Sequence, residues 1–341
     1  MIRPLTGIRV LEFEGIGPGP LAGRMLAEMG ATVTVIARPE PGVMAQKLGF
    51  AGDSPLRRDK TAVFLDLKQS GSIKQAMSLV ESADALIEGY RPGVMERLGL
   101  GPIDCAKRNP RLVYGRMTGW GQDGPLAQAA GHDLNYVALS GVLSLSAHRG
   151  ERPMVPPTVG DACGALGLAF GIASALLRVG RNGSGCIVDG AIVDVMAMLS
   201  GLALMMRNHG QLDGDQPSLF HDSPFYEVYA CADGLFITIG AIEPKFYALL
   251  LHKLGFADID PDEQYNSSEW PTLKTRFRAL FASQPRSHWC ALLEGSDACF
   301  APVLSISEAV NHPHNMARGT YRTASNGHVD AAVAPRFYPL H

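Results

Sequence analysis

At 341 residues, the chain exceeds the size at which one hydrophobic core keeps growing, so we expect two domains. The formal net charge of -3 excludes a strongly basic nucleic-acid-binding protein and a protein held electrostatically on an anionic membrane. Charged residues make up 18% of the chain, below the average of about 25%, which predicts that apolar surface is hidden in a large subunit interface.

The six cysteines are scattered, with no C-x-x-C spacing and no neighbouring histidine cluster, which favours free thiols in a reducing cytosol over a metal site or disulfides. The N-terminal segment is typical of a strand and not of a signal peptide. The longest uncharged apolar runs, 162–177 and 195–206, are shorter than the roughly 20 residues of a membrane span. We therefore expect a cytoplasmic protein with no bound metal, no nucleic acid and no membrane contact.

Strand-like and helix-like segments alternate in the first half of the chain. The apolar patterns predict strands at 7–13, 31–37, 61–67, 84–88 and 111–119, and helices at 20–29 and 71–80. Such alternation is typical of βαβ units, so the first half predicts an α/β fold: a Rossmann-like parallel sheet with helices on both faces.

The pattern changes after residue 130. Long helices are predicted at 133–143, 161–178 and 189–207, and a strand hairpin is predicted at 226–240 around Ala232-Asp233-Gly234. Further helices are expected near 244–254, 270–283 and 288–293. We predict a large domain at 1–207 to which 316–341 return, a linker at 208–225, and a smaller α+β domain at 226–315.

The loop Gly15–Pro20 (GIGPGP) lies between a predicted strand and helix, where dinucleotide-binding proteins carry G-x-G-x-x-G. Pro20 stands at the position of the third glycine, and Pro18 and Pro20 lack the N–H groups that would bind a phosphate. The loop therefore does not indicate an NAD site. We expect Pro20 to open the helix near its first position.

His132 is the first candidate for proton chemistry. It precedes a predicted helix that Asp133 would cap, and the positive end of that helix would favour the neutral imidazole, which is a base. The local sequence by itself favours the alternative, a structural histidine satisfied by hydrogen bonds at a helix start.

Asp161 opens a long apolar segment and has two compatible interpretations. It caps a buried helix, or its apolar surroundings raise its pKa so that it carries a proton near neutral pH. Capping is the more conservative interpretation.

Four cations follow predicted strands in the first half: Arg38, Lys68, Arg91 and Arg97. Ligands of open α/β sheets bind outside the carboxyl ends of the strands, so together these cations predict a polyphosphate site. Each one alone is also explained as a solvated surface charge. Glu243 precedes a predicted helix, where a first-turn carboxylate would stabilise the helix dipole.

Taken together, the segments are more specific than any one of them. They include GIGPGP at 15–20, IEGYRPGV at 87–94, ERLGLGP at 96–102, RMTGWGQ at 116–122, GHDLNY at 131–136, VGDACG at 159–164, YACADG at 229–234 and GAIEP at 240–244. With these motifs the chain resembles, over almost its whole length, the alpha-methylacyl-CoA racemases of the family III CoA-transferase superfamily.

The resemblance implies a set of site residues and an assembly. His132 and Asp161 would be the two acid/base catalysts, and Glu243 would orient His132, reaching it from the partner subunit of an interlocked homodimer. Ile16 and Tyr226 would line the substrate pocket. The acyl-CoA thioester would be the partner, with no cofactor other than the CoA of the substrate itself. The implied CoA-binding residues are Arg38, Leu65, Asp66, Leu67, Lys68, Gly89, Tyr90, Arg91, Arg97, Gly131, His132, Asp133, Leu134, Asn135 and Tyr136.

These residue types suit inversion at the α-carbon of a thioester. One proton carrier is needed on each face of the planar enolate, and a neutral imidazole with a protonated carboxyl provides a base and an acid. Backbone N–H groups near the start of the Asp161 helix are candidates to bind the enolate oxygen. Pro157 and Thr158 before Asp161, and Ala162-Cys163 after it, depart from the racemase pattern, where an Asn and a glycine run are expected.

Two alternatives stay open at this point. One is a family III CoA-transferase that uses Asp161 as the acyl acceptor and has no evident use for His132. The other is a paralogue that binds acyl-CoA without catalysing a reaction.

Overall fold

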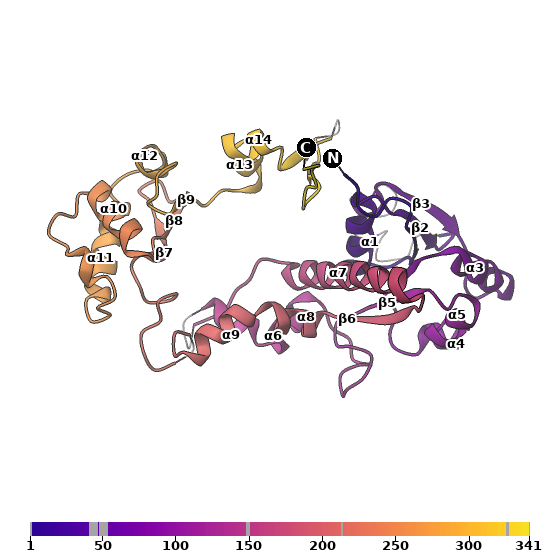
Figure 1. The fold of residues 1–341 in the computed structure, drawn as a ribbon. Helices are drawn as coiled ribbons and strands as arrows, with labels where there is room; N and C mark the ends of the chain where they lie inside the picture. Colours follow the sequence, from indigo (N-terminus) through magenta and orange to yellow (C-terminus); the bar gives the residue numbers. More distant parts are fainter. Residues whose placement is uncertain are drawn as a thin grey trace. The chain divides into compact units, whose positions relative to one another are not determined.

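The computed structural model describes residues 2–40, 47, 54–147, 151–212, 214–324 and 327–340. The chain divides into two compact units: Met1–Ser146 with Met154–Ser200 and Arg322–His341, and Ala147–Pro153 with Gly201–Tyr321. Figure 1 shows the elements of both units along the chain. The division assigns helix α9 (Gly201–Asn208) to the second unit, whereas the sequence assigned residues up to 207 to the first.

A six-stranded parallel sheet forms the centre of the first unit, with strand order β3-β2-β1-β4-β5-β6. The predicted α/β class and parallel sheet are confirmed. The strands are β1 (Arg9–Phe13), β2 (Thr32–Ala37), β3 (Lys60–Phe64), β4 (Ala85–Glu88), β5 (Val113–Thr118) and β6 (Cys186–Ala191).

Strand β6 corrects the sequence prediction of a helix at 189–207. Its β-branched Ile187 and Val188 pair with β5, and the strand runs directly into helix α8 (Ile192–Leu199). No turn residue separates strand from helix, so the apolar pattern merges the two. The pairing with β5 supplies the tertiary contact that favours the strand.

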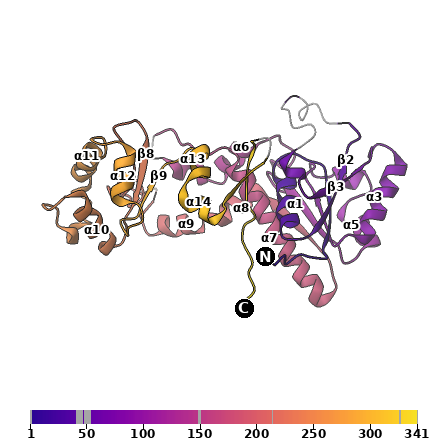
Figure 2. The same cartoon turned by 90° about the horizontal axis from the view of Figure 1, so that it is seen from above.

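Helices cover both faces of this sheet. Helices α1 (Pro18–Glu28), α7 (Val159–Asn182) and α8 enclose an aliphatic core on one face, and α3 (Ser70–Ser82), α4 (Val94–Arg97) and α5 (Pro102–Arg108) enclose another. Figure 2 shows α1 and α7 on one side of the sheet and α3 and α5 on the other. The remaining helical elements of this unit are α6 (Asp133–Leu139) and the 3-10 turns η1 (Pro55–Arg57) and η2 (Val142–Ser146).

Helix α7 is longer than the predicted 161–178. By length and composition it could cross a membrane, a test that the core helix of a soluble protein also passes. It packs against α1, β5 and β6, with Leu168 and Ile172 fully buried. Helix α1 begins at Pro18, not at Pro20 as predicted, because Gly17 is its N-cap residue with φ of 73°.

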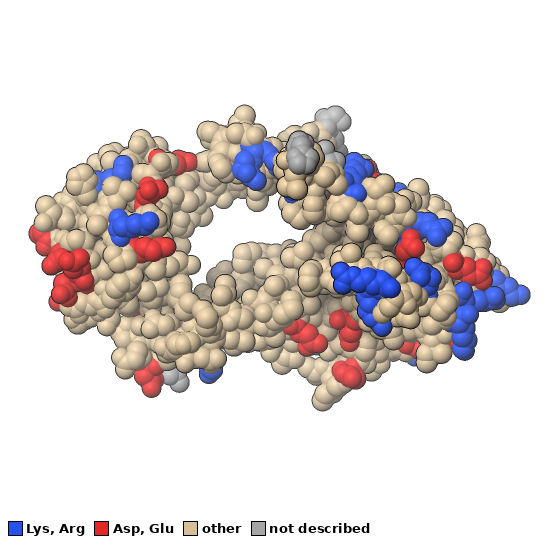
Figure 3. Space-filling model, viewed as in Figure 1, with Lys and Arg blue, Asp and Glu red and all other residues tan. Residues whose placement is uncertain are grey.

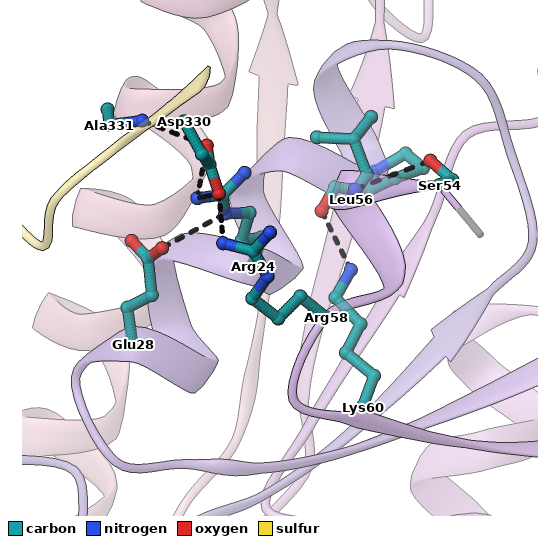
Figure 4. A network of polar contacts seen from close by, with 9 residues as sticks. Arg24, Glu28, Ser54, Leu56, Arg58, Lys60, Asp330 and Ala331 are labelled. Atoms are coloured by element: carbon teal, nitrogen blue, oxygen red, sulfur yellow. Dashed lines mark hydrogen bonds and ion pairs between the residues drawn. The ribbon is translucent and has the colours of Figure 1, made fainter. Parts of the chain in front are cut away.

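The C-terminal segment is tied to helix α1 by charge. Asp330 on β11 (Val329–Ala331) accepts two hydrogen bonds from Arg24 Nη2, of 2.9 and 2.8 Å, and also pairs with Arg58. Arg24 is held from its other side by Glu28 (Figure 4). Strand β10 (Tyr321–Thr323) pairs with β11.

The second unit has an aromatic core against a three-stranded sheet. Strands β7 (Tyr226–Ala230) and β8 (Phe236–Gly240) form the predicted hairpin, and β9 (Phe300–Pro302) adds to β8. Phe225, Tyr247 and Phe277 are fully buried in this core. The other elements after α9 are α10 (Pro244–Leu254), η3 (Pro261–Glu263), α11 (Trp270–Phe281), α12 (Arg286–Leu293), α13 (Ile306–Asn311) and α14 (Pro313–Arg318).

Candidate active site

The loops at the carboxyl edge of the parallel sheet bring together residues that are far apart in the sequence. Gly15–Gly17 follow β1, Arg38 follows β2, Leu65–Lys68 follow β3, and Gly89–Arg91 follow β4. Since all the paired strands run in the same direction, these segments meet at one edge. Figure 3 shows Lys and Arg side chains, with acidic ones among them, over the α3–α5 part of this unit.

Arg38 and Tyr90 form one polar group at this edge. The Arg38 backbone N–H donates to Glu14 Oε2 at 3.0 Å, and its side chain hydrogen-bonds to Tyr90. Burial raises the pKa of the Tyr90 hydroxyl, an effect that Arg38 partly opposes. Tyr90 is fixed through its backbone N–H, which donates to Glu88 Oε2 at 2.8 Å. The Tyr90 phenol therefore stays neutral, and its hydrogen bond holds the Arg38 guanidinium at the carboxyl edge of the sheet.

The segment Leu65–Lys68 divides into buried and exposed parts. Leu65 is a core residue, 5% exposed, whose N–H donates to Ala37 O at 2.9 Å, so its side chain is unavailable to a ligand. Asp66 accepts the Lys68 N–H at 3.1 Å, and Leu67 packs against the core. The Lys68 ammonium is exposed, as are the guanidinium side chains of Arg91 and Arg97. These cations, with the open backbone at Gly89, are what this edge offers to an anion.

Tyr136, on helix α6, and Trp120 form an aromatic pair. Their rings meet edge to face with centroids 4.7 Å apart, and the Tyr136 hydroxyl donates to Gly131 O. A Cβ on Gly131 would lie 2.7 Å from the Trp120 ring, so only glycine allows this approach. Leu134 is 58% exposed on the same helix, where its apolar side chain is open to a ligand.

Helix α6 is capped by His132, not by Asp133 as predicted. The His132 N–H donates to Asn135 Oδ1 at 3.0 Å, while the Asn135 N–H donates back to His132 O at 2.8 Å. These reciprocal bonds use backbone atoms of His132 and leave its exposed imidazole unengaged by the cap. The histidine is therefore placed at a helix start with its ring available.

Asp161 lies in the first turn of α7, whose N-cap is Thr158 in the left-handed conformation, with φ of 66°. The predicted N-cap role of Asp161 is therefore wrong. Its N–H donates to Asp133 Oδ1 at 2.8 Å, and the Thr158 N–H donates to Asp133 Oδ2 at 3.0 Å. The backbone N–H of Asp161, one of the predicted donors to an enolate oxygen, is thus already engaged.

The environment of Asp161 favours its protonated form. Burial raises the pKa of this carboxyl, the neighbouring Asp133 raises it further, and His132 opposes them. A Cβ on Gly17 would lie 3.1 Å from Asp161 Oδ2, which places the carboxyl against the β1–α1 loop, next to Ile16, which is 65% exposed. His132, Asp161 and Ile16 therefore belong to one neighbourhood of the first unit.

Glu243 and Tyr226 belong to the second unit. Glu243 is the N-cap residue of α10, one position before the predicted first turn, and its side chain is exposed. Tyr226 opens β7, stacks edge to face on Phe220 at 5.1 Å, and lines a cavity of about 620 Å³ with Val228, Phe300 and others. The structure thus brings His132 and Asp161 together in one unit and leaves these two residues in the other.

Sequence reasoning missed two features of the neighbourhood. One is the Asp133 carboxylate, which caps a helix 25 residues further along. The only signal in the sequence is the glycine at position 160, which the structure explains because a Cβ there would lie 2.9 Å from Asp133 Oδ1. The other is Trp120, whose buried Nε1 has no hydrogen-bond partner among the described residues. In the described ranges, no group of three metal-ligating side chains occurs.

Comparison with known proteins identifies the family. The chain is 40% identical to alpha-methylacyl-CoA racemase of Mus musculus, over 98% of this chain and 86% of that protein, and 39% identical to the Homo sapiens racemase, over 97% and 86%. The crystal structure of Rv3272 from Mycobacterium tuberculosis, a protein named "Probable fatty acyl-CoA transferase", superposes with a TM-score of 0.82 at 28% identity, covering 98% of this chain and 93% of that one. The model of CoA-transferase family III matches residues 5–340. The chain therefore belongs to CoA-transferase family III.

Proposed function

We propose that this protein is an isomerase that interconverts (R)- and (S)-2-methylacyl-CoA thioesters by 1,1-proton transfer. The observation that carries the proposal is the pairing of two different proton carriers: the exposed imidazole of His132 lies within electrostatic reach of Asp161, a carboxyl whose pKa burial raises. The names of the mouse and human relatives support the same reaction. A CoA-transferase that used Asp161 as acyl acceptor would use the ionised carboxylate, and burial and Asp133 raise the pKa of this carboxyl, so that form is less favourable here than in an ordinary aspartate.

The chemistry follows from the acidity of the thioester. Removing the α-proton gives an enolate whose charge delocalises onto the carbonyl oxygen. In one direction neutral His132 accepts the α-proton and the Asp161 carboxyl delivers its proton to the opposite face of the same carbon. In the other direction Asp161 is the base and protonated His132 is the acid. After each conversion the two residues regain their starting protonation through exchange with solvent, so no net proton is consumed and the α-position gains deuterium in deuterated water.

CoA would be held by the carboxyl edge of the sheet. Arg38, Lys68, Arg91 and Arg97 are cations there, and the Tyr90 hydroxyl lies beside Arg38. Phosphates pair well with guanidinium groups, which bind them in two-pronged fashion. The Asp133 carboxylate is directed to the start of helix α7, where its oxygens accept the N–H groups of Thr158 and Asp161. We propose no cofactor besides the CoA of the substrate.

A second copy of the chain would complete the molecule. Leu166, Phe170 and Leu177 on α7 are 53%, 68% and 69% exposed, and their spacing places them on one helical face. In the second unit, Leu202 on α9 is 75% exposed. Exposed apolar faces of this kind mark protein interfaces. We propose an interlocked homodimer in which Glu243 of the partner subunit orients His132.

We propose a cytoplasmic location on the evidence of the thiols. All six cysteines are free, which supports a reducing, cytoplasmic location.

The test is exchange at the α-carbon. An (R)-2-methylacyl-CoA incubated with the protein in deuterated water should lose its C2 proton signal together with its optical purity, as followed by NMR. His132→Gln and Asp161→Asn should each slow this exchange by about 10²–10⁴-fold while binding of acyl-CoA persists. His252→Gln, a change of an exposed histidine on α10, is the matched control and should exchange at the rate of the unchanged protein.

Other outcomes overturn the proposal. Retained exchange in His132→Gln would remove that residue from the mechanism. Binding without exchange, together with an Asp161 that hydroxylamine traps in the presence of acyl-CoA, would assign the protein to acyl transfer. Binding with neither reaction would leave an acyl-CoA-binding protein.

A further inference from the structure

The Asp133 carboxylate occupies the N-terminal end of α7, although Asp133 itself begins α6. Both its oxygens are engaged there, with the N–H groups of Asp161 and Thr158 at 2.8 and 3.0 Å. The first N–H groups of a helix have no partner within it, and an acidic group at that end is favoured by the helix dipole. Asp133 therefore uses donors that would otherwise be free to stabilise a negative charge on Asp161.

The close approach of the two acids is built into the packing. Gly160 is buried between them, and a Cβ there would lie 2.9 Å from Asp133 Oδ1 and 2.7 Å from Val137 Cγ2. Val137 is itself fully buried on α6. Helices α6 and α7 therefore pack closely where the Asp133 side chain reaches from α6 to the start of α7. This packing fixes the position of the Asp133 carboxylate relative to Asp161.

The charges around Asp161 come from a small set of groups. Helix α6 and its cap contribute Asp133, His132 and Tyr136, and α7 itself contributes Cys163, two residues after Asp161. The loop after β4 contributes Arg91, whose charge acts on Tyr136. The facing β1–α1 loop approaches Asp161 with Gly17, which carries no charge, and the acidic residue of that loop, Glu14, pairs with Arg57. Asp133 is therefore the acidic neighbour that raises the pKa of Asp161, and His132 is the neighbour that lowers it.

We propose that Asp133 is a positioning residue that keeps Asp161 in its protonated, proton-donating form, by placing a fixed negative charge at the end of α7 and occupying the N–H donors there. The inference rests on the proposed racemase function for its catalytic meaning. In the step concerned, the O–H bond of Asp161 breaks as a C–H bond forms at the enolate carbon. The negative charge moves from the enolate to the Asp161 carboxylate, next to Asp133. The same charge makes Asp161 a stronger base when the direction reverses.

The direct test is the titration of Asp161 by NMR in protein labelled with ¹³C at aspartate carboxyls. The signal that disappears in Asp161→Asn identifies the residue. In the unchanged protein Asp161 should titrate above the ordinary aspartate range. In Asp133→Asn, which removes the charge, its midpoint should fall by about one pH unit. Asp133→Glu keeps the charge and should restore the midpoint of the unchanged protein to within a few tenths of a unit.

A second readout is the pH profile of α-proton exchange. In the direction in which Asp161 is the acid, activity falls as this carboxyl ionises. Loss of the Asp133 charge should therefore move that alkaline limb of the profile to lower pH by the same amount, whereas a purely structural role would lower the rate without moving the limb. Asp133→Ser provides a neutral side chain that still accepts a hydrogen bond at a helix start, should Asp133→Asn fold poorly.

The outcomes separate this inference from the proposed function. An unchanged Asp161 midpoint in folded Asp133→Asn or Asp133→Ser, or an Asp161 in the unchanged protein that titrates in the ordinary range, overturns the inference even if the protein racemises its substrate. A shifted midpoint in a protein that never exchanges the α-proton overturns the racemase assignment and leaves the electrostatic role of Asp133 standing.

Discussion

Two carboxyl groups of the first unit lie in opposite electrostatic settings. Glu12, in the middle of β1, is 2% exposed and bonds to Lys60 Nζ at 2.6 Å. Asp161, at the start of α7, is partly buried, and its backbone N–H donates to the carboxylate of another acid, Asp133. Burial raises the pKa of both, that of Glu12 to about 7, but Lys60 opposes the effect at Glu12 while Asp133 adds to it at Asp161.

The difference separates a structural charge from a chemical one. Lys60 Nζ also donates to Pro20 O at 2.8 Å, so the buried pair ties strand β1 to the first turn of α1. The N-cap of that helix, Gly17, faces Asp161. Glu12, a buried acid paired with a cation, therefore stabilises the fold. Asp161, a half-buried acid without a paired cation, is free to exchange a proton.

Breaking the Glu12–Lys60 pair should have the largest effect on stability. Lys60→Met leaves Glu12 buried without its cation, and removal of one partner from a buried pair costs about 3–5 kcal/mol. Urea unfolding followed by circular dichroism measures the loss. Lys68→Met removes an exposed lysine and should change the free energy of unfolding by less than about 0.5 kcal/mol. Equal effects of the two variants would contradict the structural role of the pair.

Adding one methyl group at Gly160 should disturb the acid pair itself. In Gly160→Ala the new Cβ would approach Val137 and Asp133 closer than 3 Å, and overpacking of this kind costs about 1–3 kcal/mol. Gly180→Ala, in the same helix with open space around it, should instead stabilise the protein by about 0.5–1 kcal/mol. The midpoint of thermal unfolding measures both, and a decrease in both variants would show that the helix, not the contact, is responsible.

Removing the charge that ties the C-terminal segment to helix α1 should act locally, on that segment. Asp330→Asn removes the charge that Arg24 and Arg58 share, and a hydrogen bond to a charged group contributes about 1.5–3 kcal/mol. The segment beyond residue 321 should then become the first site of limited proteolysis. Asp104→Asn, which breaks the exposed pair with Lys107, should leave the cleavage pattern unchanged.

The sequence was most informative where one element carries the signal. The strand-helix alternation predicts the parallel sheet, and the Gly-His-Asp and Gly-Asp motifs mark both residues of the proposed acid/base pair. The sequence failed where a partner lies far along the chain: Asp133 was assigned to cap its own helix because a carboxylate fits either helix start, and only packing of α6 against α7 selects the remote one. Strand β6 was likewise hidden until β5 lay beside it.

The buried Glu12–Lys60 pair has a signal in the sequence, but the residues next to Glu12 do not identify its partner. Glu12 interrupts the buried apolar run Val10–Phe13, and a charge inside a buried strand requires a partner. The partner, Lys60, is 48 residues away and comes near through the pairing of β3 with β2, beside β1. Sheet order, which the sequence does not specify, therefore decides which cation meets the acid.

The smallest predicted effect is the pH dependence that Asp161 gives to folding. Because its pKa is raised above the ordinary value of 3.8, the folded protein binds more protons than the unfolded chain between that value and the raised one, so the free energy of unfolding falls as pH rises through this window. Asp161→Asn should flatten the curve there by less than about 1 kcal/mol, since solvent screens a half-exposed group. Asp258, whose pKa is lowered by its hydrogen bond to Arg276, gives the opposite sign, with stability that is lost as the pH falls. If the free energy of unfolding instead fell more steeply with rising pH in Asp161→Asn than in the unchanged protein, Asp161 would be stabilised as an anion. The contrast with the paired Glu12 would then disappear.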